Sequence, residues 1–224
     1  MRQIKTYLLC ISLAVLMGSS HALATVPQGS YQVQIVAADM CCKGCVQKVA
    51  GQLYAAPGVT GVKANLKDRT VVVTVSQQKG ATLEQLWQAV AAGKGGPTKL
   101  TTAGATFTLT PPESLEKSQL PSASTSYVVV ENLNHEGRAQ KIANQLYATQ
   151  GVEKVNAGAQ QNTLVVTSQQ EISPWVLIGA VTGVQERPMA IVGSYGRFDI
   201  EWSAPNTSRT NQQAHQPNNQ GIQR

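Results

Sequence analysis

Residues 39–45 read Asp-Met-Cys-Cys-Lys-Gly-Cys and hold three of the four cysteines in the chain. Neighbouring thiols form a disulfide, exchange electrons or hold a soft metal ion. Residues 31–36 alternate between polar and apolar types, which predicts a strand before the cysteines. After them, apolar residues recur at helical spacing: Val46, Val49, Ala50 and Leu53. The cysteines are therefore expected in a loop between a strand and a helix.

The first 24 residues have the three-part pattern of a secretory signal peptide. Two basic residues precede an apolar run over residues 7–17, and small residues end at Ala24. We expect cleavage before Thr25, which also removes Cys10, and a secreted or periplasmic product. The apolar run is too short to cross a bilayer, and no later run approaches that length. No membrane span is expected after cleavage.

The charge of the chain is mildly basic and unevenly distributed. Loss of Arg2 and Lys5 with the signal peptide lowers the formal net charge from +6 to +4, too little to indicate nucleic-acid binding. Residues 30–110 hold eight basic and three acidic side chains, whereas residues 127–202 hold five and seven. The two halves thus carry opposite charge.

The two halves are also related in sequence. Gln-Leu-Tyr-Ala at residues 52–55 recurs at 145–148, and the same offset pairs residues 70–74 with 163–167. After a two-residue deletion, Pro97 aligns with Pro188 and Phe107 aligns with Phe198. One deletion that aligns both ends indicates a duplicated unit, too long for a solenoid repeat and suited to a small domain.

Each copy is expected to have the element order β-α-β-β-α-β. In the first copy, Thr82 and Gln85 form a capping box that opens the second helix. The strands are expected at residues 31–36, 59–66, 70–75 and 105–109. The predicted fold class is α+β, with two ferredoxin-like domains in tandem, each a four-stranded antiparallel sheet with two helices.

The predicted organisation has five segments. A signal peptide (1–24) precedes a metal-binding domain (30–110), and a linker rich in serine and proline (111–126) leads to a second domain without the cysteine pair (127–202). The tail (203–224) is rich in Asn, Gln and Ser without an apolar run, so it is expected to be disordered.

The motif and its place in the element order resemble the heavy-metal-associated domain. This family includes copper metallochaperones, N-terminal domains of copper-exporting ATPases and an exported mercury-binding protein. The sequence Met-Cys-Cys-Lys-Gly-Cys at residues 40–45 carries the resemblance. It covers the first copy fully and the second only as a fold. The resemblance implies a ferredoxin-like fold and a metal ion held by thiolates.

The resemblance also implies roles for single residues. Cys42 and Cys45 are the expected metal ligands, and Met40 is an apolar prop beneath the loop. Cys41 stands where the family usually has a small or polar residue, so it is either a third ligand or an exposed thiol. Lys94 is the best match to a lysine that offsets the charge of the thiolates, although a solvated loop lysine is an equal alternative.

The second copy lacks this motif. At the aligned positions it has Leu133, Asn134, His135 and Arg138. A lone histidine beside an arginine is a poor site for a soft metal ion. This degenerate copy is expected to serve packing or partner docking.

The sequence thus predicts an exported protein, not an enzyme, that binds, carries or sequesters a soft metal ion. Cu(I) is the first expectation, and Hg(II), Zn(II) and Cd(II) also accept two thiolates. The expected partner is a metal-transporting or metal-accepting protein. Two alternatives remain: a structural or interaction module with a loop disulfide, and a thiol-disulfide redox protein.

Overall fold

A computed structural model describes residues 29–135 and 137–204. The predicted signal peptide and nearly all of the predicted tail therefore lie outside the described residues. Across the described part of the chain, no helix has both the length and the hydropathy needed to cross a membrane.

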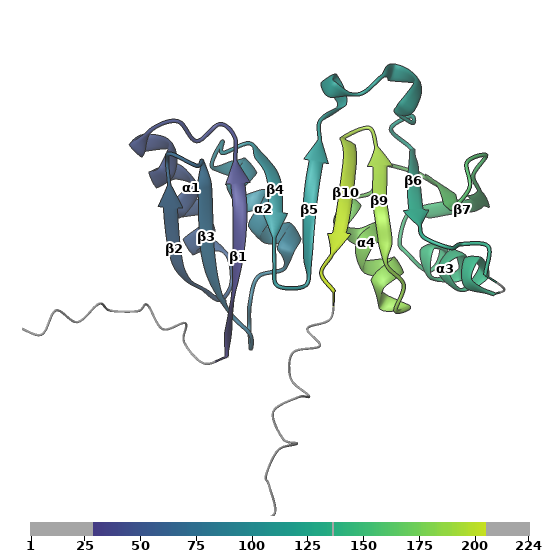
Figure 1. The fold of residues 1–224 in the computed structure, drawn as a ribbon, viewed down its shortest axis with the longest axis horizontal. Coiled ribbons are helices and arrows are strands. Elements are labelled where there is room, and N and C mark those ends of the chain that lie inside the picture. Colours follow the sequence, from purple (N-terminus) through teal and green to yellow (C-terminus); the bar gives the residue numbers. More distant parts are fainter. Residues whose placement is uncertain (1–28, 136, 205–224) are drawn as a thin grey trace, which may run out of the picture.

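The first half contains five strands and two helices (Figure 1). In chain order they are β1 (Ser30–Ala37), α1 (Lys43–Ala55), β2 (Val59–Asn65), β3 (Thr70–Ser76), α2 (Leu83–Ala92), β4 (Pro97–Thr101) and β5 (Ala105–Thr110). The predicted capping box is confirmed, because Thr82 Oγ1 accepts from Gln85 N–H while Gln85 Oε1 accepts from Thr82 N–H.

The second half repeats this order after two short 3₁₀ turns, η1 (Pro112–Ser114) and η2 (Lys117–Gln119). Its elements are β6 (Thr125–Val130), α3 (Arg138–Tyr147), β7 (Val152–Ala157), β8 (Thr163–Ser168), α4 (Pro174–Gly183), β9 (Pro188–Gly193) and β10 (Gly196–Trp202). Strand β6 thus begins inside the stretch predicted as a linker.

Within residues 29–135 and 137–204, all ten strands form one antiparallel sheet in the order β2-β3-β1-β4-β5-β10-β9-β6-β8-β7. The order is symmetric about its centre, where the whole of β5 pairs with β10, from Thr110–Arg197 to Ala105–Trp202. The predicted α+β class is confirmed, but the prediction of two separate four-stranded sheets is not confirmed. Each half contributes five strands, and the fifth strands join the halves.

The strand that the sequence prediction missed is β4, which pairs with β1 and holds the fourth position of a ferredoxin-like sheet. It is only five residues long and begins at Pro97, a residue usually found at strand ends or edges. The predicted last strand, residues 105–109, is β5. It follows β4 in a hairpin and provides the edge that β10 completes.

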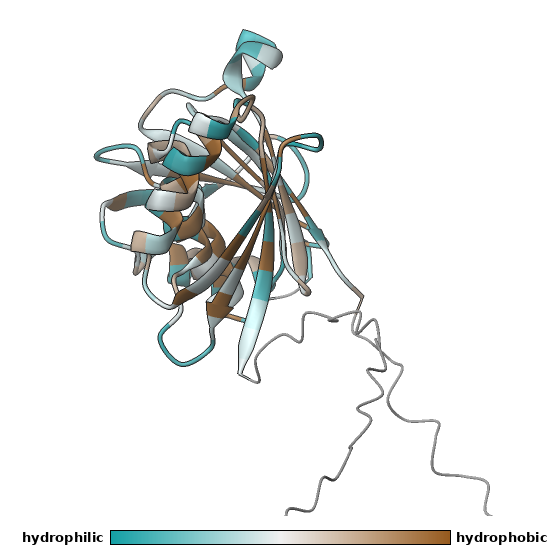
Figure 2. Cartoon of the chain, turned by 90° about the vertical axis from the view of Figure 1, so that its left-hand side faces the viewer, coloured by the Kyte–Doolittle hydropathy of each residue, from teal (hydrophilic) through white to brown (hydrophobic). Residues whose placement is uncertain are grey.

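All four α-helices lie on one face of the sheet, and hydrophobic residues gather between helices and sheet (Figure 2). The buried residues of both halves form one continuous cluster. On β1 and β3 the helix-facing residues alternate with partly exposed ones, so their side chains are divided between a buried face and an open face.

Aromatic residues fill the junction between the halves. All three tryptophans and both phenylalanines of the chain lie there. Trp175 of the second half lies 5.8 Å from Trp87 and 5.1 Å from Phe107 of the first half, measured between ring centroids. Phe198 lies 5.2 Å from Trp87 in the same way. Tilted aromatic pairs at this spacing add to the stabilisation from burial, so the halves share a core.

A hydrogen bond also links the two halves. Ser173, at the start of α4, donates from its hydroxyl to the Glu84 carboxylate in the first turn of α2, at 2.7 Å. The bond lies beside the aromatic junction and ties together the starts of two equivalent helices.

Candidate metal centre

The loop between β1 and α1 places Cys42 at the N-cap of the helix. Its backbone is extended, and its sulfur accepts a hydrogen bond of 3.2 Å from the backbone N–H of Cys45. An N-cap side chain usually satisfies a free N–H of the first turn with an oxygen, and here a sulfur does so. The hydrogen bond holds the Cys42 sulfur beside Cys45.

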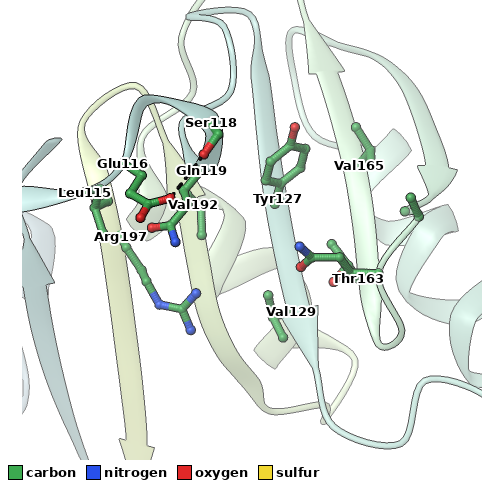
Figure 3. A pocket seen from close by; sticks show the side chains of 13 residues that line it. Leu115, Glu116, Ser118, Gln119, Tyr127, Val129, Thr163, Val165, Val192 and Arg197 are labelled. Atoms are coloured by element: carbon green, nitrogen blue, oxygen red, sulfur yellow. Dashed lines mark hydrogen bonds between the residues drawn. The ribbon is translucent and has the colours of Figure 1, made fainter.

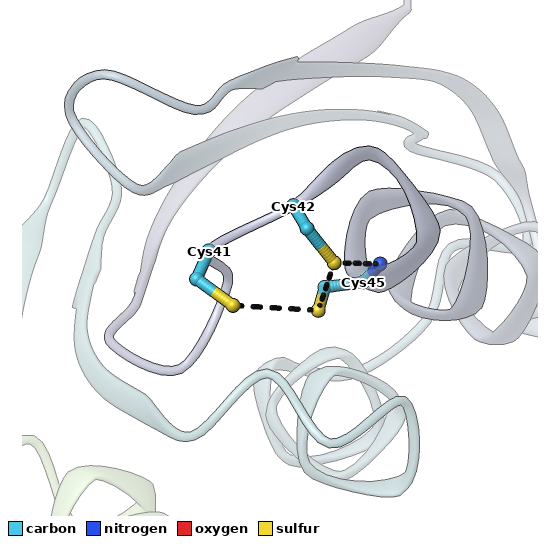
Figure 4. Close-up of side chains that lie close together, drawn as sticks. All are labelled: Cys41, Cys42 and Cys45. Carbon is cyan, nitrogen blue, oxygen red and sulfur yellow. Dashed lines mark hydrogen bonds between the residues drawn. The ribbon is translucent and has the colours of Figure 1, made fainter.

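The three predicted cysteine sulfurs form one cluster (Figure 4). All three lie within 4.8 Å of one another, Cys42 Sγ is 2.8 Å from Cys45 Sγ, and Cys41 Sγ is 3.8 Å from Cys45 Sγ. Two thiolates that share a tetrahedral zinc ion, each about 2.3 Å from it, lie about 3.8 Å apart. The Cys41–Cys45 spacing fits such a site, whereas the Cys42 and Cys45 sulfurs must separate by about 1 Å.

The thiols are accessible and free. Cys41 and Cys42 are exposed, and Cys45 is half-buried. Because the side chains are not enclosed, a small rotation of Cys42 can open the space for an ion without disturbing the core. The donor set suits soft ions, since thiolates select Cu(I), Zn(II) and similar ions over Mg²⁺ or Ca²⁺.

The cluster also sets the acidity of its members. Hydrogen bonding from the Cys42 thiol, followed by that from the loop backbone at Cys41, lowers the pKa of Cys45 to about 7. Hydrogen bonding to Cys45, followed by electrostatic repulsion from Cys45 and Cys42, raises the pKa of Cys41. Cys45 therefore becomes a thiolate before Cys41 does as the pH rises.

Met40 anchors the cysteine loop from below. Its side chain is fully buried in the core, although its neighbours Cys41 and Cys42 are exposed. A buried side chain directly before an exposed pair fixes the height of the loop above the core. No contact between the Met40 sulfur and the cysteines is needed for this role.

The loop after α2 holds the other side of the site. The backbone N–H of Ala38 donates to Gly96 O and that of Asp39 donates to Gly95 O, both at 2.9 Å. Gly96 has a left-handed backbone (φ +57°), and a Cβ there would collide with the Asp39 carboxylate. Lys94 is exposed and left-handed (φ +57°) in this same loop, one residue before the contact.

Arg69 is a supporting residue that the sequence did not reveal. Its guanidinium donates to Ala38 O at 2.9 Å, and its own carbonyl accepts from Ala37 N–H at 2.8 Å. Arg69 lies in the β2–β3 turn, 31 residues away in sequence. The run of glycines around Lys94 was a signal for the close approach of the α2–β4 loop, but nothing in the sequence marked Arg69.

The second half has an ion pair in place of the cysteine cluster. Arg138, aligned with Cys45, donates from Nε to Glu186 Oε2 at 2.6 Å, and both side chains are mostly buried. Glu186 lies in the loop after α4, which matches the loop of Lys94 in the first half. His135 is exposed. Among the described residues, the three cysteines form the one group of three potential metal ligands this close together.

Comparisons with known proteins agree with this placement. A family model described as the heavy-metal-associated domain matches residues 35–95. No curated protein matches the chain.

Solved structures give weaker likenesses. The water-soluble region of the P-type ATPase CopA from Bacillus subtilis is 16% identical, over 71% of this chain and 89% of that one, with a TM-score of 0.29. The N-terminal extension of CzcP from Cupriavidus metallidurans is 18% identical, over 69% of this chain and 97% of that one, with a TM-score of 0.25. Scores this low assign no function. The family match stands on residues 35–95, which therefore form a heavy-metal-associated domain within the first half of the chain.

Proposed function

We propose that the protein binds one soft metal ion through the thiolates of Cys42 and Cys45, and that it carries or sequesters this ion outside the cytoplasm. The observation that carries the proposal is the cluster of three free sulfurs within 4.8 Å at the start of α1. The family match over residues 35–95 supports heavy-metal binding. Export follows from the signal-peptide pattern of residues 1–24. No catalytic role is proposed.

Cu(I) is the proposed ion, and Cys41 is the proposed third ligand where an ion takes three sulfurs. Cu(I) is among the ions that soft thiolates select. The pKa of Cys41 is raised whereas that of Cys45 is lowered, so Cys41 loses its proton after Cys45 and joins the site after the Cys45 thiolate engages. Lys94, one residue before the loop contact at Gly95, is proposed to offset the negative charge of the bound site.

The exposure of the sulfurs also suits transfer. A partner thiolate must reach the ion to take it, and Cys41 and Cys42 are open to solvent. The proposed partner is a metal-transporting or metal-accepting protein. For the second half, we propose a degenerate copy of the first, in which the Arg138–Glu186 ion pair holds together the loops before α3 and after α4. These loops correspond to the two that flank the metal site in the first half.

One observation favours a second candidate, a disulfide between Cys42 and Cys45. Their sulfurs are 2.8 Å apart, closer than two thiolates on one ion, and a disulfide needs about 2.05 Å. In an oxidising compartment this pair closes unless metal or a reductant holds it open. Metal binding and disulfide formation therefore compete for the same atoms.

The test is a Cu(I) titration of the reduced chain from Thr25 onward, which lacks Cys10. The titration is carried out under anaerobic conditions in the presence of a competing chelator. We expect one equivalent to bind tightly, Cys42→Ser and Cys45→Ser to abolish tight binding, and Cys41→Ser to weaken it less. A loss with Cys41→Ser equal to the other two identifies a three-thiolate site. Unchanged affinity in both Cys42→Ser and Cys45→Ser would overturn the proposal.

A further inference from the structure

A cavity of about 580 Å³ lies on the open face of the sheet, in the half without cysteines (Figure 3). Its floor is formed by sheet side chains: Tyr127, Val129, Val165 and Val192. The η1–η2 segment, including Glu116, covers it from the other side, and residues 158–160 after β7 line its edge. Sites for small organic molecules have volumes of about 300–1,000 Å³, and this cavity falls within that range.

Strand register explains why the floor faces away from the helices. Tyr127 pairs with Val165 on one side and with Val192 on the other, so these three form one row across the sheet. The chain neighbours of Tyr127, Ser126 and Val128, are buried on the helix side. Because successive side chains of a strand point to opposite faces, Tyr127 points to the open face.

The equivalent row of the first half is more polar. Gln34 pairs there with Val72 and with Thr101, in the positions that Tyr127, Val165 and Val192 hold in the second half. Gln34 is exposed. A sheet with one face in water usually presents polar side chains there, and the first half follows that rule. The second half instead has an aromatic and two valines facing the cavity.

The next row shows the same difference. Val129 pairs with Ala190 in the second half, whereas Val36 pairs with Lys99 in the first. In both rows, the second half thus has an apolar side chain where the first half has a polar one. The η1–η2 segment lies over this apolar patch and leaves the cavity unfilled, so the patch can contact a ligand.

A cation lies at the rim of the apolar floor. Arg197, on β10, pairs with Asp199 through Nε at 2.7 Å, and its side chain is 42% exposed. Among the described residues, its two Nη groups have no hydrogen-bond partner. A guanidinium with free Nη donors binds carboxylates and related anions in a fixed geometry. Glu116, the acidic side chain of the roof, accepts a hydrogen bond from the Ser118 hydroxyl at 3.4 Å.

We propose that this cavity binds a small amphipathic organic anion. The apolar body of the ligand packs on Tyr127, Val165 and Val192, and its anionic group accepts hydrogen bonds from the free Nη donors of Arg197. The site lies on the face of the sheet opposite the helices, and it does not depend on metal binding by the cysteines. The second half thereby has a binding role of its own.

The probe is 1-anilinonaphthalene-8-sulfonate, which joins an apolar aromatic body to a sulfonate, and the neutral comparison is N-phenyl-1-naphthylamine. The chain from Thr25 onward contains every described residue and is titrated with each. We expect saturable binding of one sulfonate probe per chain. Tyr127→Gln, which installs the first-half residue, should weaken both probes at least tenfold. Arg197→Thr, which likewise installs the residue of the first half, should weaken binding of the sulfonate probe about fivefold. It should leave the affinity for the neutral probe within twofold of the original.

The control is Thr101→Val, which places in the first half the residue found at the equivalent second-half position, Val192, and should leave both probes unchanged. Circular dichroism and thermal unfolding check that each variant is folded, and Arg197→Thr tests the site independently if Tyr127→Gln does not fold. Sulfonate affinity within twofold of the original in both variants, or binding without saturation, would overturn the proposal. Equal weakening of both probes by Arg197→Thr would also contradict it, because the arginine would then act through structure and not charge.

Discussion

The lowered pKa of Cys45 and the raised pKa of Cys41 set the order in which these two thiols ionise. Because its pKa is about 7, the Cys45 thiolate predominates above pH 7 and declines below it, whereas Cys41, with its raised pKa, stays protonated to higher pH. We therefore predict that the rate of Cys45 alkylation by iodoacetamide rises with a midpoint near pH 7. Trypsin cuts after Lys43, so the peptide of residues 44–48 reports Cys45 alone.

The control for this prediction is Cys42→Ala, which removes the hydrogen bond that contributes most to the lowered pKa of Cys45. Its Cys45 midpoint should move upward, toward that of an ordinary thiol at about 8.5. A midpoint that stays near 7 in this variant would assign the shift to the backbone of the loop instead of to the Cys42 thiol.

Much of the candidate site could be predicted from the sequence because its three cysteines are neighbours in the chain. The spacing of Cys42 and Cys45 already places both sulfurs at one helix start. The parts that were not predicted come from elsewhere in the chain. The Arg69 guanidinium donates a hydrogen bond to Ala38 O, 31 residues away, and no local sequence pattern indicates such a contact. The Cys42–Cys45 separation of 2.8 Å depends on side-chain rotation, which spacing does not determine.

Among the elements, the crossing of α1 and α2 depends on a glycine. A Cβ added at Gly93 would lie 2.6 Å from Val49 Cα, closer than side-chain and backbone carbons approach. We predict that Gly93→Ala destabilises the protein by about 1–3 kcal/mol, because the backbone of α1 must move. Urea unfolding of the reduced, metal-free protein measures this change.

Gly51 provides the matched control within α1. A Cβ there meets nothing within 4 Å. Gly51→Ala should therefore stabilise the protein by about 0.5–1 kcal/mol, because alanine favours the helix interior. If Gly93→Ala is as stable as the original chain, the close packing of the two helices at this point is not a constraint.

The ion pair of the second half supports a further prediction. Arg138 and Glu186 are mostly buried, so Arg138→Ala leaves a poorly solvated carboxylate and should cost about 1–3 kcal/mol in unfolding free energy. The comparison is Arg197→Ala, whose pair with Asp199 is 42% exposed on each side and should contribute at most about 0.5 kcal/mol. Equal effects of the two substitutions would show that burial does not strengthen the Arg138 pair.

Elements with strong local signals were predicted and a weak one was not. Strand β3 is a run of β-branched residues, and α2 begins with a capping box, so local sequence specifies both. Strand β4 begins with proline and has three polar side chains among its five residues, and only its pairing with β1 and β5 makes it a strand. Tertiary context decides such a segment.

The whole molecule is predicted to unfold as one unit. Its halves share a continuous core, a ten-stranded sheet and the aromatic junction. All three tryptophans lie at that junction, so tryptophan fluorescence reports its loss, while circular dichroism at 222 nm reports both halves. The two signals should show one coincident transition in urea. Separate midpoints would mean that the halves unfold independently.

The joining of the halves could not be predicted from the repeat. A duplicated pattern gives two similar units, but it does not say whether they touch or which strands meet. The β5–β10 pairing and the contacts of Trp175 with Trp87 and Phe107 link residues about 70 to 100 positions apart, beyond any local period.

The most direct test of metal binding follows the alkylation of Cys45 while Cu(I) is added. The reduced chain from Thr25 onward is treated without oxygen, and the peptide of residues 44–48 is quantified after each addition. Thiolates that hold an ion are not free to react, so Cys45 alkylation should fall in proportion to added Cu(I) and reach its minimum at one equivalent. Alkylation of Cys45 at the metal-free rate, with one equivalent of Cu(I) present, would contradict the assignment of the metal to this cluster.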